Sequence, residues 1–221
     1  KGVQSLSSIS KVAENEAIRQ QGLIDIKETL VKRIKKTDLE DIKVEDVTIL
    51  LKGCESNIVK KLLKDDGCAK AIKLLGFNGL LKKPDTRLGR ELSTYAKIAS
   101  GIGGIIHSDE LPGYGITVKE IEKLKQLLNT REDDAFVIAI GRENVVKTAL
   151  QAVIDRARKT LDGVLEEVRR ALPDDTTEYM RPLAGAARMY PETDVQPIRI
   201  TQERIQNIKK HLPETFEKKH K

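Results

Sequence analysis

Six consecutive apolar residues at positions 135–140 constrain the fold of this chain more than any other feature. The run follows Asp133 and Asp134 and is closed by Gly141. A continuous apolar run of this length, bounded by turn residues, is typical of a strand that is buried on both faces. The sequence therefore predicts a central strand with other elements packed on each side of it.

Helical and extended patterns surround this strand. The clearest helix is 117–129, because Thr117 and Glu120 form a T-x-x-E capping box ahead of an apolar stripe. Other helices are predicted at 9–33, 56–64, 90–100, 142–161, 163–172 and 201–211. Short strands are predicted at 68–75, 103–107 and 176–181. The predicted fold class is α+β, with strands and helices mixed over residues 44–161.

Several classes of protein are excluded by composition and spacing. Cys54 and Cys68 lie fourteen positions apart without a CxxC motif, so neither a disulfide framework nor a four-ligand zinc site is predicted. The histidines at 107, 211 and 220 have no HExxH spacing, and we assign no metal site. No apolar run approaches the roughly 20 residues of a membrane helix. We expect reduced thiols, a cytoplasmic location and no membrane partner.

The first ten residues contain no signal-peptide pattern. The chain starts with Lys1 rather than Met, which we interpret as a cut inside a longer chain.

Positive charge is concentrated in one part of the chain. The net charge is +6, and residues 52–90 alone hold ten basic and four acidic side chains, which is the same excess. Such an excess suits a surface that contacts phosphate groups, but from charge alone a solvated lysine-rich face is the preferred interpretation. The chain has only three Phe and four Tyr and no Trp, which argues against recognition of bases by stacking on aromatic platforms.

Two irregular segments contain candidate functional side chains. Residues 107–115 combine His107, Asp109 and Glu110, which suit metal binding or acid–base chemistry, although a structured turn would use the same residues. Residues 179–194 contain two arginines able to fork onto phosphate or carboxylate, and the carboxylates Glu192 and Asp194. A structural ion-pair loop is the alternative for this second segment.

The second segment resembles a known family. Residues 180–182 (MRP) and 187–194 (ARMYPETD) resemble a signature of the E subunit of archaeal glutamyl-tRNA(Gln) amidotransferase, with departures at Ala184 and Gln196, where we expect Pro. Residues 2–4 and 14–20 resemble the strand and helix of that family's catalytic cradle. Residues 107–116 and 134–137 resemble the domain inserted in these proteins, which is similar to the insertion domain of bacterial-type aspartyl-tRNA synthetases.

The resemblance implies an organisation and a reaction. Residues 1–35 and 163–221 are expected to be two segments of the cradle domain, flanking an insertion domain at 40–162. Members of the family use ATP and Mg²⁺ to activate the γ-carboxylate of Glu carried by tRNA(Gln). Ammonia from a glutaminase/asparaginase-like D subunit then gives Gln-tRNA(Gln). Most ATP and metal ligands are expected outside this chain, so the fragment alone is expected to be inactive.

The resemblance also implies which residues take part. The catalytic candidates near the activation site are Arg181, Arg188, Tyr190, Glu192 and Asp194. The candidates for tRNA contact are Lys60, Lys61, Lys64, Lys82, Lys83, Arg87 and Arg90. The alternative interpretation is a non-enzymatic module that binds RNA or scaffolds a subunit interface.

Overall fold

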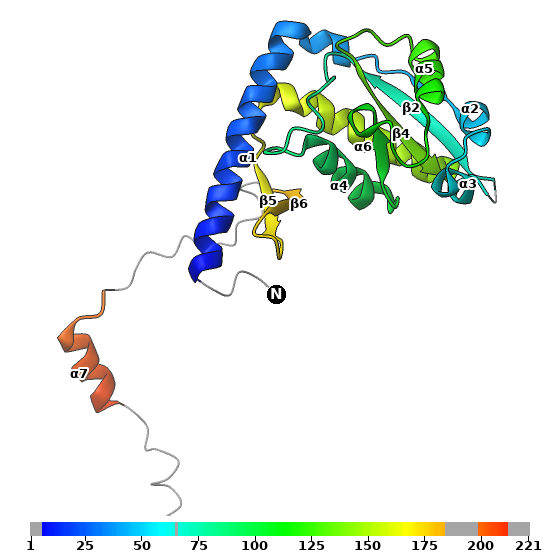
Figure 1. Cartoon of the computed structure of the whole chain (residues 1–221). Coiled ribbons are helices and arrows are strands. Elements are labelled where there is room, and N and C mark those ends of the chain that lie inside the picture. Colours follow the sequence, from blue (N-terminus) through cyan, green and yellow to red (C-terminus); the bar gives the residue numbers. More distant parts are fainter. Residues whose placement is uncertain (1–5, 65, 184–198, 212–221) are drawn as a thin grey trace, which may run out of the picture. The chain divides into compact units, whose positions relative to one another are not determined.

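The computed structural model describes residues 6–64, 66–183 and 199–211 (Figure 1). The chain divides into two compact units, residues 1–183 and residues 184–221. The second unit contains helix α7 (Gln202–Lys210), which begins after Thr201, whose hydroxyl accepts a hydrogen bond from the backbone N–H of Arg204. The helix predicted at 201–211 is therefore confirmed. The fold class α+β is also confirmed.

A four-stranded antiparallel sheet forms the centre of the first unit, in the order β1-β2-β4-β3. Strand β4 (Ala135–Gly141) pairs with β2 (Cys68–Leu74) on one side and with β3 (Ile105–His107) on the other. Strand β1 (Val44–Asp46) pairs with the free side of β2. The apolar run at 135–140 is therefore the predicted central strand.

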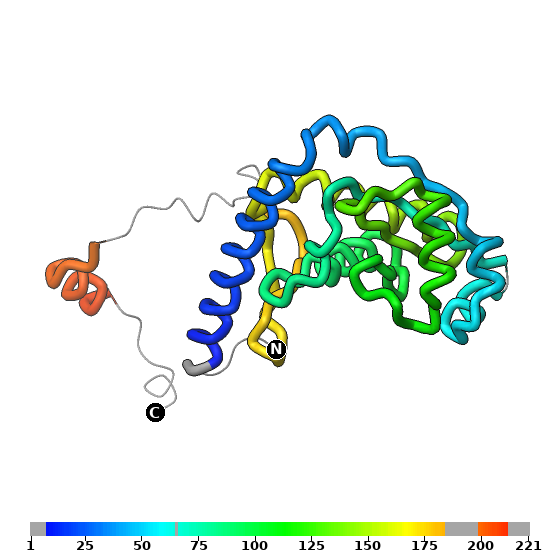
Figure 2. The backbone as a smooth tube through the Cα atoms, turned by 45° about the horizontal axis from the view of Figure 1, so that its top comes forward, coloured from blue at the N-terminus to red at the C-terminus, as the bar shows by residue number. Residues whose placement is uncertain are grey.

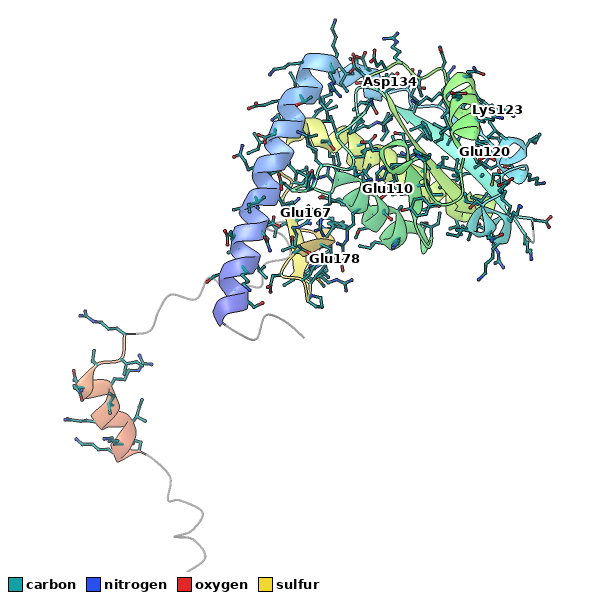
Figure 3. All side chains as sticks on the ribbon, viewed as in Figure 1. Glu110, Glu120, Lys123, Asp134, Glu167 and Glu178 are labelled. Atoms are coloured by element: carbon teal, nitrogen blue, oxygen red, sulfur yellow. The ribbon has the colours of Figure 1, made fainter. Side chains whose placement is uncertain are left out.

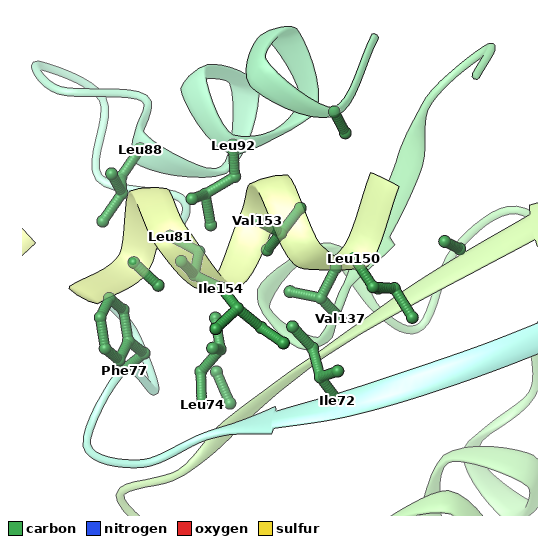
Figure 4. Packing of buried hydrophobic residues seen from close by; sticks show 14 of the residues in the cluster. Ile72, Leu74, Phe77, Leu81, Leu88, Leu92, Val137, Leu150, Val153 and Ile154 are labelled. Atoms are coloured by element: carbon green, nitrogen blue, oxygen red, sulfur yellow. The ribbon is translucent and has the colours of Figure 1, made fainter. Parts of the chain in front are cut away.

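Both faces of the sheet are covered, which explains why β4 is apolar at every position. Ala135, Val137 and Ala139 face one hydrophobic cluster, which helix α6 (Glu143–Lys159) covers. Helix α4 (Leu88–Ser100) packs on α6 and adds residues to the same cluster. Figure 4 shows Leu150, Val153 and Ile154 of α6 above Ile72 and Leu74 of β2. The alternate residues Phe136, Ile138 and Ile140 face a second cluster.

The second cluster is covered by three short helices, α2 (Thr48–Lys52), α3 (Asn57–Leu62) and α5 (Val118–Leu127). Thr117 and Glu120 form the predicted capping box of α5. Three 3₁₀ helices occupy connections at Lys36–Leu39, Ser108–Glu110 and Thr160–Asp162.

Helix α1 (Leu6–Arg33) runs along the side of this unit next to a two-stranded hairpin (Figures 1 and 2). Leu23, Ile26 and Leu30 of α1 join the cluster around α6. The hairpin consists of β5 (Glu167–Ala171) and β6 (Thr177–Pro182). The helix expected at 9–33 and the strand expected at 176–181 are confirmed.

The helix predicted at 163–172 is wrong. Gly163 instead has φ of 94°, which a helix does not accept, and β5 follows. Residues 167–171 pair with β6 through backbone hydrogen bonds, and Arg169 reaches Glu16 of α1 and Glu91 of α4. These tertiary contacts override local helix propensity. The division of the first unit into cradle segments and an insertion domain stays a prediction.

Candidate functional site

A cavity of about 340 Å³ opens between helix α1, helix α4 and the β5–β6 hairpin. These three elements are far apart in the sequence, and a concave site of this kind is the first place to look for a ligand. The lining residues from α1 are Asn15, Ile18 and Arg19. Residues 84–87 and Arg90, Glu91 and Thr94 of α4 form a second wall, and Arg169 with residues 176–179 forms the third.

The base of the cavity is a buried ion-pair network centred on Glu91. The Glu91 side chain accepts hydrogen bonds from Arg156 Nη2 at 2.8 Å and from Arg19 Nη1 at 3.2 Å. Arg169 Nη1 lies 3.6 Å from the same carboxylate. Burial acts to raise the pKa of Glu91, but the three guanidinium groups together lower it by more than burial raises it. The net pKa is below the ordinary value, so the carboxylate stays ionised.

Two more glutamates complete the network. Glu16 pairs with Arg19 at 2.7 Å and with Arg169 at 3.5 Å, and Glu167 pairs with Arg169 at 2.8 Å. Burial acts to raise the pKa of Glu16, but hydrogen bonds from Arg19 and Thr177 lower it to about 2. Because three arginines face three glutamates, the network as a whole is electrically neutral.

Two tyrosines attach the hairpin to helix α4. The rings of Tyr95 and Tyr179 stack with their centroids 3.9 Å apart, and the Arg156 guanidinium lies 5.6 Å from the Tyr95 centroid. The Tyr95 hydroxyl donates a hydrogen bond to Glu167 at 2.5 Å. Burial and this carboxylate raise the pKa of Tyr95, so the phenol stays protonated. Figure 3 shows Glu167 and Glu178 on the hairpin beside α1.

The rim of the cavity, in contrast to its buried base, carries charges of both signs: Arg87 and Arg90 lie with the acidic lining residues Asp85 and Glu178. Arg87 is exposed and lies 3.9 Å from Asp174, a weak ion pair. No carboxylate in residues 6–64, 66–183 or 199–211 lies within ion-pair distance of Arg90. Glu178 is already bound by Arg170 at 2.5 Å. Over the whole lining, four arginines face three carboxylates, an excess of one positive charge, and Arg90 is the rim guanidinium without an ion pair in the described ranges.

Thr86 lines the cavity and is only 3% exposed. Its methyl group packs closely on Gly22 of α1, where any larger side chain would clash. Its hydroxyl oxygen is buried and has no hydrogen-bond partner within the part of the chain that the structure describes. This close approach fixes α1 against the segment before α4.

The predicted tRNA-contact residues fall into two groups. Arg87 and Arg90 line the cavity, and Lys82 and Lys83 lie in the same connection to α4. Lys60 and Lys61 lie on α3, and Lys64 follows that helix. The residues at 82–90 come after the C-terminal end of β2, and the residues at 60–64 come before its N-terminal end. Seven residues of strand span about 20 Å, so the groups do not form one patch. Their contact with tRNA stays a prediction.

The predicted catalytic residues are described only in part. Arg181 lies on the exposed end of β6, opposite Val168 of β5. Arg188, Tyr190, Glu192 and Asp194 lie outside the described residues. The proximity of these five side chains stays a prediction.

Sequence reasoning missed the ion-pair network, although a signal for it exists. Arg19 lies on the apolar stripe of α1 between Val12 and Leu23, and Arg156 follows Val153 on the buried stripe of α6. A charged residue in a buried helical stripe requires a buried partner of opposite charge. That signal predicts a partner but does not identify Glu91 as the partner.

The segment around His107 is a structured turn. His107 is buried with Nε2 3.2 Å from Glu110, and Asp109 accepts a hydrogen bond from the backbone N–H of Leu81 at 2.9 Å. Burial lowers the pKa of His107. Among the described residues, no three His, Cys, Asp or Glu side chains are grouped to hold a metal ion.

Comparison with known proteins finds one matching domain model and a set of similar proteins. Residues 59–150 match the GAD domain. The chain is 48% identical over 222 residues to the E subunit of glutamyl-tRNA(Gln) amidotransferase from Methanococcus maripaludis strain C5, covering 99% of this chain and 35% of that protein. It is 50% identical over 223 residues to the corresponding protein of Methanocaldococcus jannaschii, with the same coverage.

The corresponding protein of Pyrococcus furiosus is 50% identical over 219 residues, covering 97% of this chain and 34% of that protein. The resemblance predicted from residues 180–194 and their flanks is therefore confirmed. The chain spans about a third of the length of these curated relatives. Among the described residues, no helix is long and apolar enough to cross a membrane.

Proposed function

We propose that this chain is a part of a tRNA-dependent amidotransferase that uses ATP to convert Glu-tRNA(Gln) to Gln-tRNA(Gln). The observation that carries the proposal is 48–50% identity over 97–99% of the chain to relatives named as the E subunit of that enzyme. The partner expected to supply ammonia is a glutaminase/asparaginase-like D subunit. The cytoplasm is the expected location.

Among the described residues, no three His, Cys, Asp or Glu side chains are grouped, and the resemblance implies that the earlier part of the cradle carries most of the ATP and metal ligands. We therefore place most ATP and Mg²⁺ ligands in parts of the parent protein beyond this chain, and we expect the chain alone to be inactive. Arg181, Arg188, Tyr190, Glu192 and Asp194 are proposed to lie near the activated carboxylate. There the arginines would hold anionic groups and the acidic pair would orient a cation or an amine.

Substitution of the acidic pair Glu192 and Asp194 distinguishes a catalytic role of this segment from a purely structural one. In the intact complex, Glu192→Gln and Asp194→Asn should each lower the rate of Gln-tRNA(Gln) formation. Glu166→Gln changes an exposed carboxylate of the hairpin region and serves as the matched control. Unchanged turnover in both acidic variants would make these residues structural and favour the non-enzymatic RNA-binding or subunit-interface module.

Contact with tRNA(Gln) is proposed for the two basic groups. Each neutralised phosphate releases counterions, so the logarithm of the binding constant should fall with the logarithm of salt concentration by about 0.9 per contact. A filter-binding titration of the chain against tRNA(Gln) at two salt concentrations measures this slope. Weak binding that does not depend on salt would contradict the proposal.

A further inference from the structure

We propose that the cavity between α1, α4 and the β5–β6 hairpin binds one phosphodiester group of the tRNA backbone, with Arg87 and Arg90 as its ligands. The inference rests on the proposed function, because it takes RNA as the partner.

The charge of the cavity favours an anion. The network at the base is neutral, because each of its arginines is paired with a glutamate. The charge that a ligand meets is therefore set by the rim, which also holds Asp85 and Glu178, and the lining as a whole has four arginines against three carboxylates. There Arg87 has only a 3.9 Å contact to Asp174, and Arg90 has no ion pair within the described ranges. A guanidinium group can donate two parallel hydrogen bonds to phosphate oxygens, which makes its binding geometrically more specific than that of a lysine ammonium group.

The geometry places these donors on one wall. Arg90 and Glu91 lie four and three residues before Thr94, so they lie on one face of α4 with it, and Arg87 is the residue that precedes the first turn of this helix. The N-terminal end of a 13-residue helix adds a favourable potential for an anion. Glu91 lies on the same face, but its charge is compensated by Arg19, Arg156 and Arg169.

The size and lining favour a backbone group rather than a base. About 340 Å³ lies at the lower end of the range for small-molecule sites. Tyr179 supplies an aromatic ring to the lining, but it is only 9% exposed and stacks on Tyr95. Little ring surface is available for stacking on a base, whereas phosphate contacts need only the rim donors.

The position of the cavity joins two parts of the chain. One wall comes from residues 84–94, within the predicted insertion domain, and the others come from α1 and β6, within the predicted cradle segments. Strand β6 continues from Tyr179 to Arg181, the first proposed residue of the activation segment. A phosphate held here therefore lies beside the strand that leads to that segment.

Filling the cavity without changing its charge tests the proposal. Thr94→Leu adds apolar volume to the lining, and Thr148→Leu on α6 is the matched control. Both threonines donate a hydrogen bond to the carbonyl four residues earlier at 3.0 Å, and Thr148 lies outside the cavity. Fluorescence anisotropy with tRNA(Gln) gives Kd for each variant of the 221-residue chain, and urea unfolding confirms that both variants fold.

We expect Thr94→Leu to raise Kd for tRNA by roughly ten-fold, the loss of one charge-assisted contact, while Thr148→Leu leaves Kd unchanged. Arg90→Gln, a second variant that keeps the cavity open, should lower the salt slope by about one. Equal Kd values for Thr94→Leu, Thr148→Leu and the unmodified chain would overturn the cavity proposal while leaving the proposed function intact. No binding of tRNA by the unmodified chain would overturn the cavity proposal and the proposed tRNA contact of this chain, whereas the proposed function is tested separately by amidation in the intact complex.

A parallel titration with ATP distinguishes the source of the phosphate. The proposal requires that Thr94→Leu weaken binding of tRNA and leave any ATP binding unchanged. Weakened binding of ATP alone would assign the cavity to a free nucleotide and overturn the assignment to RNA.

Discussion

Glu91→Gln should be one of the most destabilising single changes in this chain, although it adds and removes almost no volume. The Glu91 carboxylate is 6% exposed and compensates Arg156, Arg19 and Arg169. Gln keeps the shape but carries no charge, so three guanidinium groups would share two carboxylates. Arg156 is 1% exposed and has no access to water in place of its lost partner.

Removing one partner from a buried ion pair typically costs about 3–5 kcal/mol, because the remaining charge is left uncompensated. For a slope of about 2 kcal/mol per molar urea, that loss lowers the unfolding midpoint by about 1.5–2.5 M. Equilibrium urea unfolding, followed by circular dichroism near neutral pH, measures the shift.

Glu143→Gln is the control, since Glu143 pairs with Lys147 at 2.8 Å on an exposed face of α6. Exposed pairs contribute little to stability, so its midpoint should not move measurably. If Glu91→Gln shifts the midpoint no more than Glu143→Gln does, the network does not hold α1 and the hairpin to α4, and the reasoning is refuted.

Three further predictions test other parts of the fold. Phe136→Ala should cost about 3–5 kcal/mol in urea unfolding, because a fully buried ring of the second cluster is lost; a loss below ~1 kcal/mol would show that the cluster is loosely packed. Tyr95→Phe should cost about 1–2 kcal/mol in thermal unfolding, since Glu167 loses one hydrogen bond; an unchanged melting temperature would contradict that bond. The pKa of Glu16 falls on folding from 4.5 to about 2, so its stabilisation is complete above pH 4.5 and is lost as the pH falls toward 2. Urea unfolding across this window should therefore show a weaker acid dependence for Glu16→Gln than for the unmodified chain, and equal dependence would argue against the depressed pKa.

Local sequence patterns predicted a helix or strand correctly where the residues of that element alone indicate how it is buried or where it begins. The run at 135–140 identifies β4 because only a strand covered on both faces needs apolar residues at consecutive positions. The capping box identifies the start of α5 for the same local reason.

Features that depend on distant segments could not be predicted in the same way. Strand β5 exists because β6 pairs with it and because Arg169 reaches Glu16 and Glu91. The cavity requires residues separated by more than a hundred positions to meet. The basic residues at 60–64 and 82–90 are close in sequence, but strand β2 carries the chain across the sheet between them.

Steady-state amidation by the intact complex, with the concentration of Glu-tRNA(Gln) varied, tests most directly whether these residues serve a tRNA-dependent amidotransferase. We predict that Arg87→Gln/Arg90→Gln raises KM for Glu-tRNA(Gln) by roughly ten-fold or more and changes kcat by less than about two-fold, because phosphate contacts contribute mainly to uniform binding. Lys123→Gln/Lys125→Gln on α5 removes the same charge from an exposed helix far from the cavity and should leave both constants unchanged (Figure 3). An unchanged KM in the arginine variant, or an equal rise in the lysine control, would contradict the specific role of the cavity, and a complex that forms no Gln-tRNA(Gln) at all would contradict the proposed function.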